Sequence, residues 1–117
     1  MISVRAGLRR ILDRAKGIEV VGETDSGDAL PALVRTAQPD VVVMDIEMPG
    51  PGVLKVIPAV SAERPGLRVL VLSGHSEESY AVHVLRAGAS GYLEKALATD
   101  QLVAAVHRVH ATLSSMG

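Results

Sequence analysis

Two uninterrupted apolar runs, each followed at once by a polar residue, limit most strongly what this chain can fold into. Residues 41–44 (VVVM) lead into Asp45, and residues 69–72 (VLVL) lead into Ser73. An apolar run without alternation is typical of a strand that is covered on both faces, as in a parallel sheet between helices. Amphipathic segments with helical spacing separate these runs. The pattern therefore predicts an α/β fold with a doubly wound parallel sheet.

Strands and helices are expected to alternate along the whole chain. Strands are predicted at 18–22, 41–44, 69–72 and 91–95, and helices at 4–15, 29–37, 53–63, 77–87 and 99–110. Pro58 lies inside the third of these helices, which is therefore expected to be short, kinked or late in starting. Because 117 residues are too few for two domains of ordinary size, we expect a single domain over residues 1–117.

The composition excludes several classes of protein. Basic and acidic side chains nearly balance, at 12 and 13, so disorder, a polybasic arm and a nucleic-acid patch driven by net charge are not expected. Cysteine is absent, which excludes disulfides, thiolate metal sites and a cysteine nucleophile. No apolar run approaches the roughly 18 to 20 residues of a membrane span, and the N-terminus lacks a signal-peptide core. These observations favour a cytoplasmic domain that binds neither membrane nor, directly, nucleic acid.

Three polar residues stand where predicted strands end. Asp45, Ser73 and Lys95 place a carboxylate, a hydroxyl and an ammonium at the carboxyl ends of successive strands. Ligands of open parallel sheets bind beyond this edge. A carboxylate can attack a phosphoryl donor, and an ammonium and a hydroxyl can then bind the added negative charge. Each residue alone also fits the simpler role of meeting solvent, but the three together favour phosphoryl chemistry.

Familiar enzyme motifs are absent from the sequence. It contains no Gly-x-Ser-x-Gly turn, no Walker P-loop and no Gly-x-Gly-x-x-Gly fingerprint, so we expect a domain that is not an enzyme. His107 and His110 lie three residues apart in the last predicted helix and could share a metal ion. A solvated helix face is the favoured interpretation, because no acidic partner is placed to complete that site.

Three segments resemble one known family. They are residues 39–50 (PDVVVMDIEMPG), 69–75 (VLVLSGH) and 86–95 (RAGASGYLEK). In this order and spacing they resemble the receiver domain of bacterial two-component response regulators, and the resemblance runs over residues 4–109. It implies a flavodoxin-like sheet, a phosphoryl group accepted from a sensor histidine kinase, and a protein-binding face that phosphorylation switches.

The resemblance assigns roles around the phosphoryl group. Asp45 resembles the phospho-accepting aspartate, and Ser73, Gly74 and Lys95 resemble the residues that contact the phosphate. Ser73 and Tyr92 resemble the pair that switches the protein-binding face. A half-buried core aromatic is the equally weighted alternative for Tyr92.

Mg²⁺ is the cofactor that the resemblance implies. Asp45 and the backbone carbonyl of Glu47 would be its ligands, and Glu47 and His75 sit where the family tunes the lifetime of the acyl phosphate. The family's acidic pair, which helps to hold the ion, has no counterpart here, because no acidic residue precedes Asp13. We therefore expect an incomplete metal site and impaired phosphorylation of Asp45.

The family's first strand also has no counterpart. Residues 1–8 (MISVRAGL) resemble the segment that follows the acidic pair, so we expect an N-terminally truncated fold with the first central strand absent. Unpaired ladder groups on its neighbours would cost about 1 to 3 kcal/mol each. Three repairs are open: the strand at 18–22 pairs with the strand at 41–44, residues 1–4 form a short strand, or a partner chain completes the sheet.

Two other functions stay open from the sequence. A receiver-like fold without metal chemistry could serve as a phosphorylation-independent dimerisation or scaffold module, whose partner is a second copy of the chain. A flavodoxin-like domain that binds a small molecule is the weaker alternative, because no phosphate loop supports it.

Overall fold

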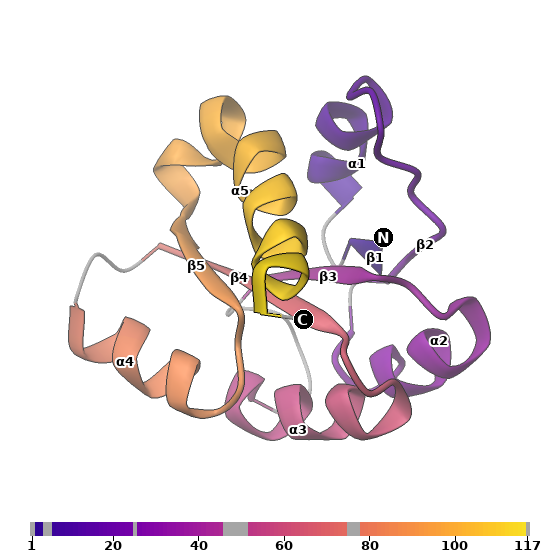
Figure 1. The fold of residues 1–117 in the computed structure, drawn as a ribbon, viewed down its shortest axis with the longest axis vertical. Helices are drawn as coiled ribbons and strands as arrows, with labels where there is room; N and C mark the ends of the chain where they lie inside the picture. The colour runs from indigo at the N-terminus through magenta and orange to yellow at the C-terminus, as the bar shows by residue number, and fades with distance from the viewer. Residues whose placement is uncertain (1, 4–5, 25, 46–51, 75–77, 117) are drawn as a thin grey trace.

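The architecture is an open parallel sheet with helices on both faces (Figure 1). This computed structural model describes residues 2–3, 6–24, 26–45, 52–74 and 78–116. Its elements in chain order are β1 (Ile2–Ser3), α1 (Ala6–Asp13), β2 (Gly22–Glu23), α2 (Leu30–Ala37), β3 (Val41–Asp45), α3 (Val53–Glu63), β4 (Arg68–Ser73), α4 (Glu78–Arg86), β5 (Gly91–Glu94) and α5 (Lys95–Met116). Neighbouring strands are all parallel, in the order β2-β1-β3-β4-β5. The predicted doubly wound, flavodoxin-like sheet is confirmed.

Two helices cover one face of the sheet and three cover the other. α1 and α5 lie together on one face, and α2, α3 and α4 lie on the opposite face (Figure 1). Successive residues of the central strands contribute alternately to the two buried clusters, as the two-residue period of a strand requires. Val42, Met44, Val69 and Val71 belong to the cluster under α2–α4, and Val41, Val43, Leu70 and Leu72 belong to the cluster under α5.

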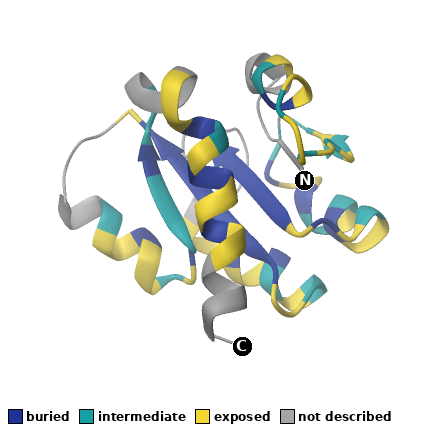
Figure 2. Ribbon diagram, turned by 45° about the horizontal axis from the view of Figure 1, so that its top comes forward, coloured by how far each residue is buried: buried dark blue, intermediate teal, exposed yellow. Residues whose placement is uncertain are grey.

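β3 and β4 are the most deeply buried part of the molecule. All of their residues are buried, and Figure 2 shows them as the dark centre between helices whose outer surfaces are exposed. The two strands stay in register over their common length, from Val41 opposite Arg68 to Asp45 opposite Leu72. Both apolar runs of the sequence are therefore central strands covered on both faces, as predicted.

The structure corrects the expected absence of a central strand. Ile2–Ser3 forms β1, which lies between β2 and β3 and pairs with both. Of the three expected repairs, the short strand within residues 1–4 is therefore the one observed. The strand predicted at 18–22 does not move next to β3, because β1 separates the two.

Several element boundaries differ from the predicted ones. β2 is confined to Gly22–Glu23, since β1 offers pairing partners to these two residues. α3 spans the predicted range with Pro58 inside it, and Pro58 is exposed. α5 starts at Lys95, directly after β5 and earlier than predicted. In the described part of the chain, no helix combines the length and the apolar character that crossing a bilayer requires.

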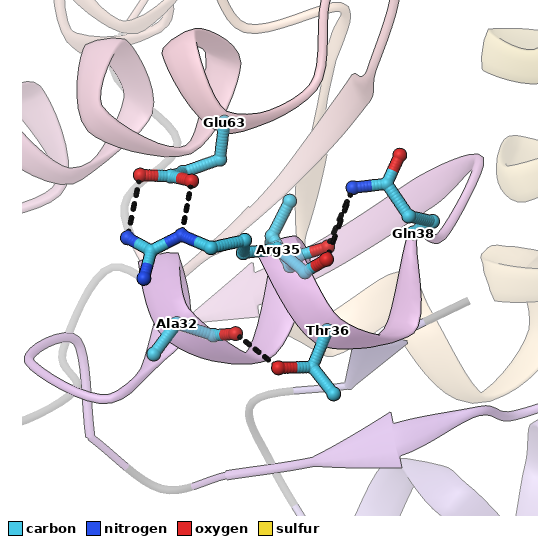
Figure 3. Close-up of polar contacts among 6 residues, drawn as sticks. Ala32, Arg35, Thr36, Gln38 and Glu63 are labelled. Atoms are coloured by element: carbon cyan, nitrogen blue, oxygen red, sulfur yellow. Dashed lines mark hydrogen bonds and ion pairs between the residues drawn. The ribbon is translucent and has the colours of Figure 1, made fainter.

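A bidentate ion pair between Arg35 of α2 and Glu63 of α3 joins the two helices on the surface (Figure 3). Arg35 donates from Nε to Glu63 Oε2 at 2.7 Å and from Nη2 to Glu63 Oε1 at 2.8 Å. Next to it, Gln38 adopts a left-handed conformation with φ of 49° and ends α2 by donating its backbone N–H to the Val34 carbonyl. This left-handed cap turns the chain from α2 back into β3.

Because α5 approaches β5 closely at Gly91, we expect a single methyl group added there to destabilise the fold. A Cβ added at Gly91 would lie 2.7 Å from Val109 Cγ1 and 3.2 Å from Leu70 Cδ1, both buried. We expect Gly91→Ala to lower the free energy of unfolding by about 1–3 kcal/mol, because overpacking displaces the helix or the strand. Gly52→Ala is the matched control, since a Cβ there meets no atom within 4 Å. Urea unfolding should show a loss below about 1 kcal/mol for the control, and equal losses would contradict this account of the α5–β5 contact.

The Arg35–Glu63 pair predicts a dependence of stability on pH. Hydrogen bonds from Arg35 lower the pKa of the Glu63 carboxyl in the folded chain. A lowered folded pKa means that the pair stabilises above the ordinary glutamate pKa of about 4.3 and loses this effect as the pH falls below it. Glu63→Gln should therefore melt below the unchanged protein near pH 7 and approach it near pH 3. Melting curves across this range check the prediction, and a constant difference between the two proteins would contradict it.

Candidate functional site

The candidate site lies at the carboxyl edge of the sheet, where three neighbouring strands end. Asp45 is the last residue of β3, Ser73 is the last residue of β4, and Lys95 follows β5 as the first residue of α5. The pairing register aligns them, because Asp45 lies opposite Leu72 and Ser73 lies opposite Glu94. The strand register thus places the three polar residues side by side at this edge of the sheet.

Asp45 and Lys95 meet in a partly shielded ion pair. Lys95 Nζ lies 2.9 Å from Asp45 Oδ2, and 8% of the Asp45 side chain and 22% of the Lys95 side chain are exposed. An ammonium at this distance is well placed to neutralise a carboxylate, or charge added to it. The structure therefore brings together the two charged residues of the predicted site.

Ser73 and Gly74 continue β4 beyond Asp45. Ser73 is fully buried, whereas the following Gly74 is exposed. Gly74 itself contributes no side chain to the space next to the strand end. Glu47 and His75, the predicted lifetime-tuning residues, lie outside the described residues, and so does the Glu47 carbonyl that was expected to bind the metal.

Tyr92 lies on β5, two residues before the strand ends. It is partly buried and packs against the cluster under α2–α4. This position satisfies the simple expectation of a half-buried core aromatic. It also lies one strand from Ser73, so the predicted switch pair sits on adjacent strands, β4 and β5.

Among the described residues, Asp45 is the one predicted ligand of Mg²⁺. No group of three or more histidine or acidic side chains within them could hold a metal ion, and the Asp45 carboxylate is already paired with Lys95. Mg²⁺ prefers octahedral oxygen ligands and is usually anchored by carboxylates together with water. His107 and His110, the second candidate pair, are exposed on α5 and border a hollow at the opposite edge of the sheet. No sequence motif had predicted this hollow.

A family model and curated relatives match most of the chain. The model described as the response regulator receiver domain matches residues 2–107. The response regulator UvrY of Escherichia coli K12 is 40% identical over 107 residues, which cover 92% of this chain and 49% of the relative. GacA of Pseudomonas aeruginosa is 35% identical over 108 residues, covering 92% and 50%. The chain thus spans about half the length of these relatives.

Solved structures agree with the sequence matches. A LuxR-family two-component response regulator from Aurantimonas sp. SI85-9A1 has a TM-score of 0.87 and 32% identity, covering 96% of this chain and 84% of that one. The signal receiver domain of the response regulator NarL from Mycobacterium tuberculosis has a TM-score of 0.84 and 32% identity, covering 93% and 92%. Strand order, the Asp45–Lys95 pair and both kinds of match lead to one conclusion: this chain belongs to the family of response regulator receiver domains.

Proposed function

We propose that this domain accepts a phosphoryl group on Asp45 from a sensor histidine kinase in the cytoplasm. The Asp45–Lys95 pair at the carboxyl edge of the sheet is the observation that supports this most directly. An oxygen of the Asp45 carboxylate attacks the phosphorus of a phosphohistidine, the phosphorus–nitrogen bond breaks, and the nitrogen keeps the electron pair. The product is an acyl phosphate on Asp45.

Lys95 and Ser73 would respond to the new negative charge. Lys95 already lies within 2.9 Å of the carboxylate and would pair with the phosphoryl oxygens. The Ser73 hydroxyl, buried at the end of β4, would form a hydrogen bond to the same group, with Gly74 leaving room for it. Movement of Ser73 would be transmitted to Tyr92 on the adjacent strand and so to the surface around β5. This is the proposed route from phosphorylation to a protein-binding face.

Phosphorylation is proposed to be slow in this chain. Asp45 is the one predicted acidic ligand that the described part includes, and the first acidic residue of the sequence is Asp13, at the end of α1. Too little negative charge is available to anchor a hard divalent cation. Without such a cation, Lys95 is the main positive charge that offsets the repulsion between the Asp45 carboxylate and the anionic phosphoryl donor.

The proposed partners are a sensor histidine kinase and a second copy of the chain. UvrY, matched over 49% of its length, is named as a response regulator, and DegU of Brevibacillus brevis, 42% identical over 102 residues and matched over 43% of its length, is named as a transcriptional regulatory protein. In a parent of this type, the receiver domain itself would bind proteins and leave contact with DNA to another part of the polypeptide.

Incubation with acetyl phosphate and Mg²⁺, followed by intact-mass measurement, tests the proposal. A fraction of the chains is expected to gain one phosphate slowly, because the nucleophile is present and the metal site is proposed to be incomplete. Asp45→Asn should abolish the gain, since the amide is no nucleophile. Asp40→Asn is the matched control, because Asp40 lies at the other end of β3 and is exposed.

The outcomes separate the two candidate functions. Fast and complete phosphorylation that Asp45→Asn abolishes would confirm the phosphoacceptor and contradict its impairment. No mass gain over hours would favour the phosphorylation-independent dimerisation or scaffold module. Equal gain in Asp45→Asn would place the phosphate elsewhere and overturn the assignment of Asp45.

The ion pair predicts a pattern of stability in variants. Lys95→Met should lower the free energy of unfolding by about 1–3 kcal/mol, because it leaves the shielded Asp45 carboxylate without its ammonium. Adding Asp45→Asn to Lys95→Met should restore part of the loss, since the neutral amide costs less to shield. Lys55→Met, at an exposed position of α3, is the control and should change stability by less than about 0.5 kcal/mol. Denaturant unfolding of these proteins, together with the single Asp45→Asn variant, checks this, and strict additivity of the two site substitutions would contradict a direct interaction.

A further inference from the structure

Arg68 is a buried charged residue that the proposed phosphoryl chemistry does not use. Among the described residues, the buried polar or charged side chains are those of Asp45, Ser73 and Arg68, and the first two belong to the candidate site. Arg68 is the first residue of β4, and only 7% of it is exposed. It therefore lies at the amino edge of the sheet, at the other end of the strand that finishes in Ser73.

The strand geometry directs the Arg68 side chain toward the face that α5 covers. Leu70 and Leu72, two and four residues further along β4, belong to the cluster under α5. Because side chains two residues apart on a strand share a face, the stem of Arg68 lies on this side as well, next to its register partner Val41. The aliphatic stem of an arginine is well suited to this apolar surrounding, but the guanidinium at its end is a cation that needs compensation.

Within the described part of the chain, the guanidinium of Arg68 has a hydrogen bond but no ion pair. Its Nη1 donates to the Gly66 carbonyl. Its Nη2 is buried and has no hydrogen-bond partner, and none of the ion pairs in that part includes Arg68. A buried cation without an anion costs more free energy than a paired cation or an apolar side chain of similar size. Arg68 therefore destabilises the isolated domain.

Arg64, four residues earlier in the chain, is an arginine whose donors are satisfied. Its Nη2 lies 3.0 Å from Asp40 Oδ1, and its Nη1 donates to the Pro39 carbonyl. Arg68 also contacts Asp40, but through the backbone, because its N–H donates to the Asp40 carbonyl at 3.1 Å. The Asp40 carboxylate is thus paired with Arg64 and not with Arg68.

The unused edge of the Arg68 guanidinium has the geometry of a carboxylate site. In the Arg35–Glu63 pair, the edge formed by Nε and Nη2 holds both carboxylate oxygens, at 2.7 and 2.8 Å (Figure 3). Two parallel N–H bonds along this edge match the spacing of the two oxygens of a carboxylate. The bond from Arg68 to Gly66 uses Nη1, which is not part of this edge, so the unpartnered Nη2 and Nε can act together.

We propose that Arg68 binds an aspartate or glutamate side chain of a partner protein through its Nε–Nη2 edge. Because Nη2 is shielded, the guanidinium rotates to meet the carboxylate, which gives up its one hydrogen bond to Gly66 and gains two charge-assisted ones. The ion pair forms where little water reaches it, so it is stronger than a pair on the open surface. The site is separate from Asp45 and supplies an interaction with acidic partners at the opposite edge of the sheet.

Thermal unfolding of two arginine variants tests whether Arg68 lacks a counter-ion. Arg68→Met keeps much of the aliphatic stem and removes the charge, so the melting temperature should rise by about 3 °C or more. Arg64→Met is the matched control from the same loop. It should not raise the melting temperature, because Arg64 already has the Asp40 carboxylate and the Pro39 carbonyl as partners.

Titration of the intact chain with two tripeptides, followed by NMR of the arginine Nε–H signals, tests the ligand. Acetyl-Ala-Glu-Ala-amide and acetyl-Ala-Gln-Ala-amide have the same shape and differ in the carboxylate. The first should shift the Arg68 signal at millimolar concentration and bind at least about tenfold more tightly than the second. Arg68→Lys keeps the charge but loses the bidentate edge, so in this variant the glutamate peptide should bind at least about threefold more weakly. Sodium acetate and sodium sulfate, titrated separately, show whether a free anion binds equally well.

Three results would overturn the proposal. One is an unchanged or lower melting temperature of Arg68→Met, since the guanidinium would then be satisfied within the fold or by bound water. Another is equal binding of the two tripeptides, or no shift of the Arg68 signal at millimolar concentration. The third is binding of acetate or sulfate as tight as that of the glutamate peptide, which would indicate a site for a small free anion.

Discussion

Hydrogen bonding between β3 and β4, shielded from water on both faces, is the constraint on which the rest of this structure depends. Val41–Asp45 and Arg68–Ser73 are buried along their entire length, and each must therefore find its backbone partners within the sheet. Helices on both sides exclude the water that could otherwise satisfy these groups. The same ladder aligns the ends of the two strands, so the relative positions of Asp45 and Ser73 follow from the register of two apolar strands.

Elements with a strong local pattern could be predicted from the sequence, and elements defined by their neighbours could not. The apolar runs identified β3 and β4, and helical spacing identified the five helices, because these signals lie within the segments themselves. β1 has two described residues, Ile2 and Ser3, which are too few to show a period. Its existence depends on two strands on either side that need a partner. β2 is short for the same reason, since pairing with β1 defines it.

The candidate site likewise contains residues that the sequence could predict, whereas other features of the molecule depend on the assembled fold. Asp45 and Lys95 follow strands with clear signals, and the 2.9 Å contact between them confirms their predicted proximity. The hollow that His107 and His110 border could not be predicted, because its residues come from three separate parts of the sequence and share no motif. Only the assembled fold brings these parts together. The buried Arg68 was equally inaccessible to prediction, since only the register places it opposite Val41.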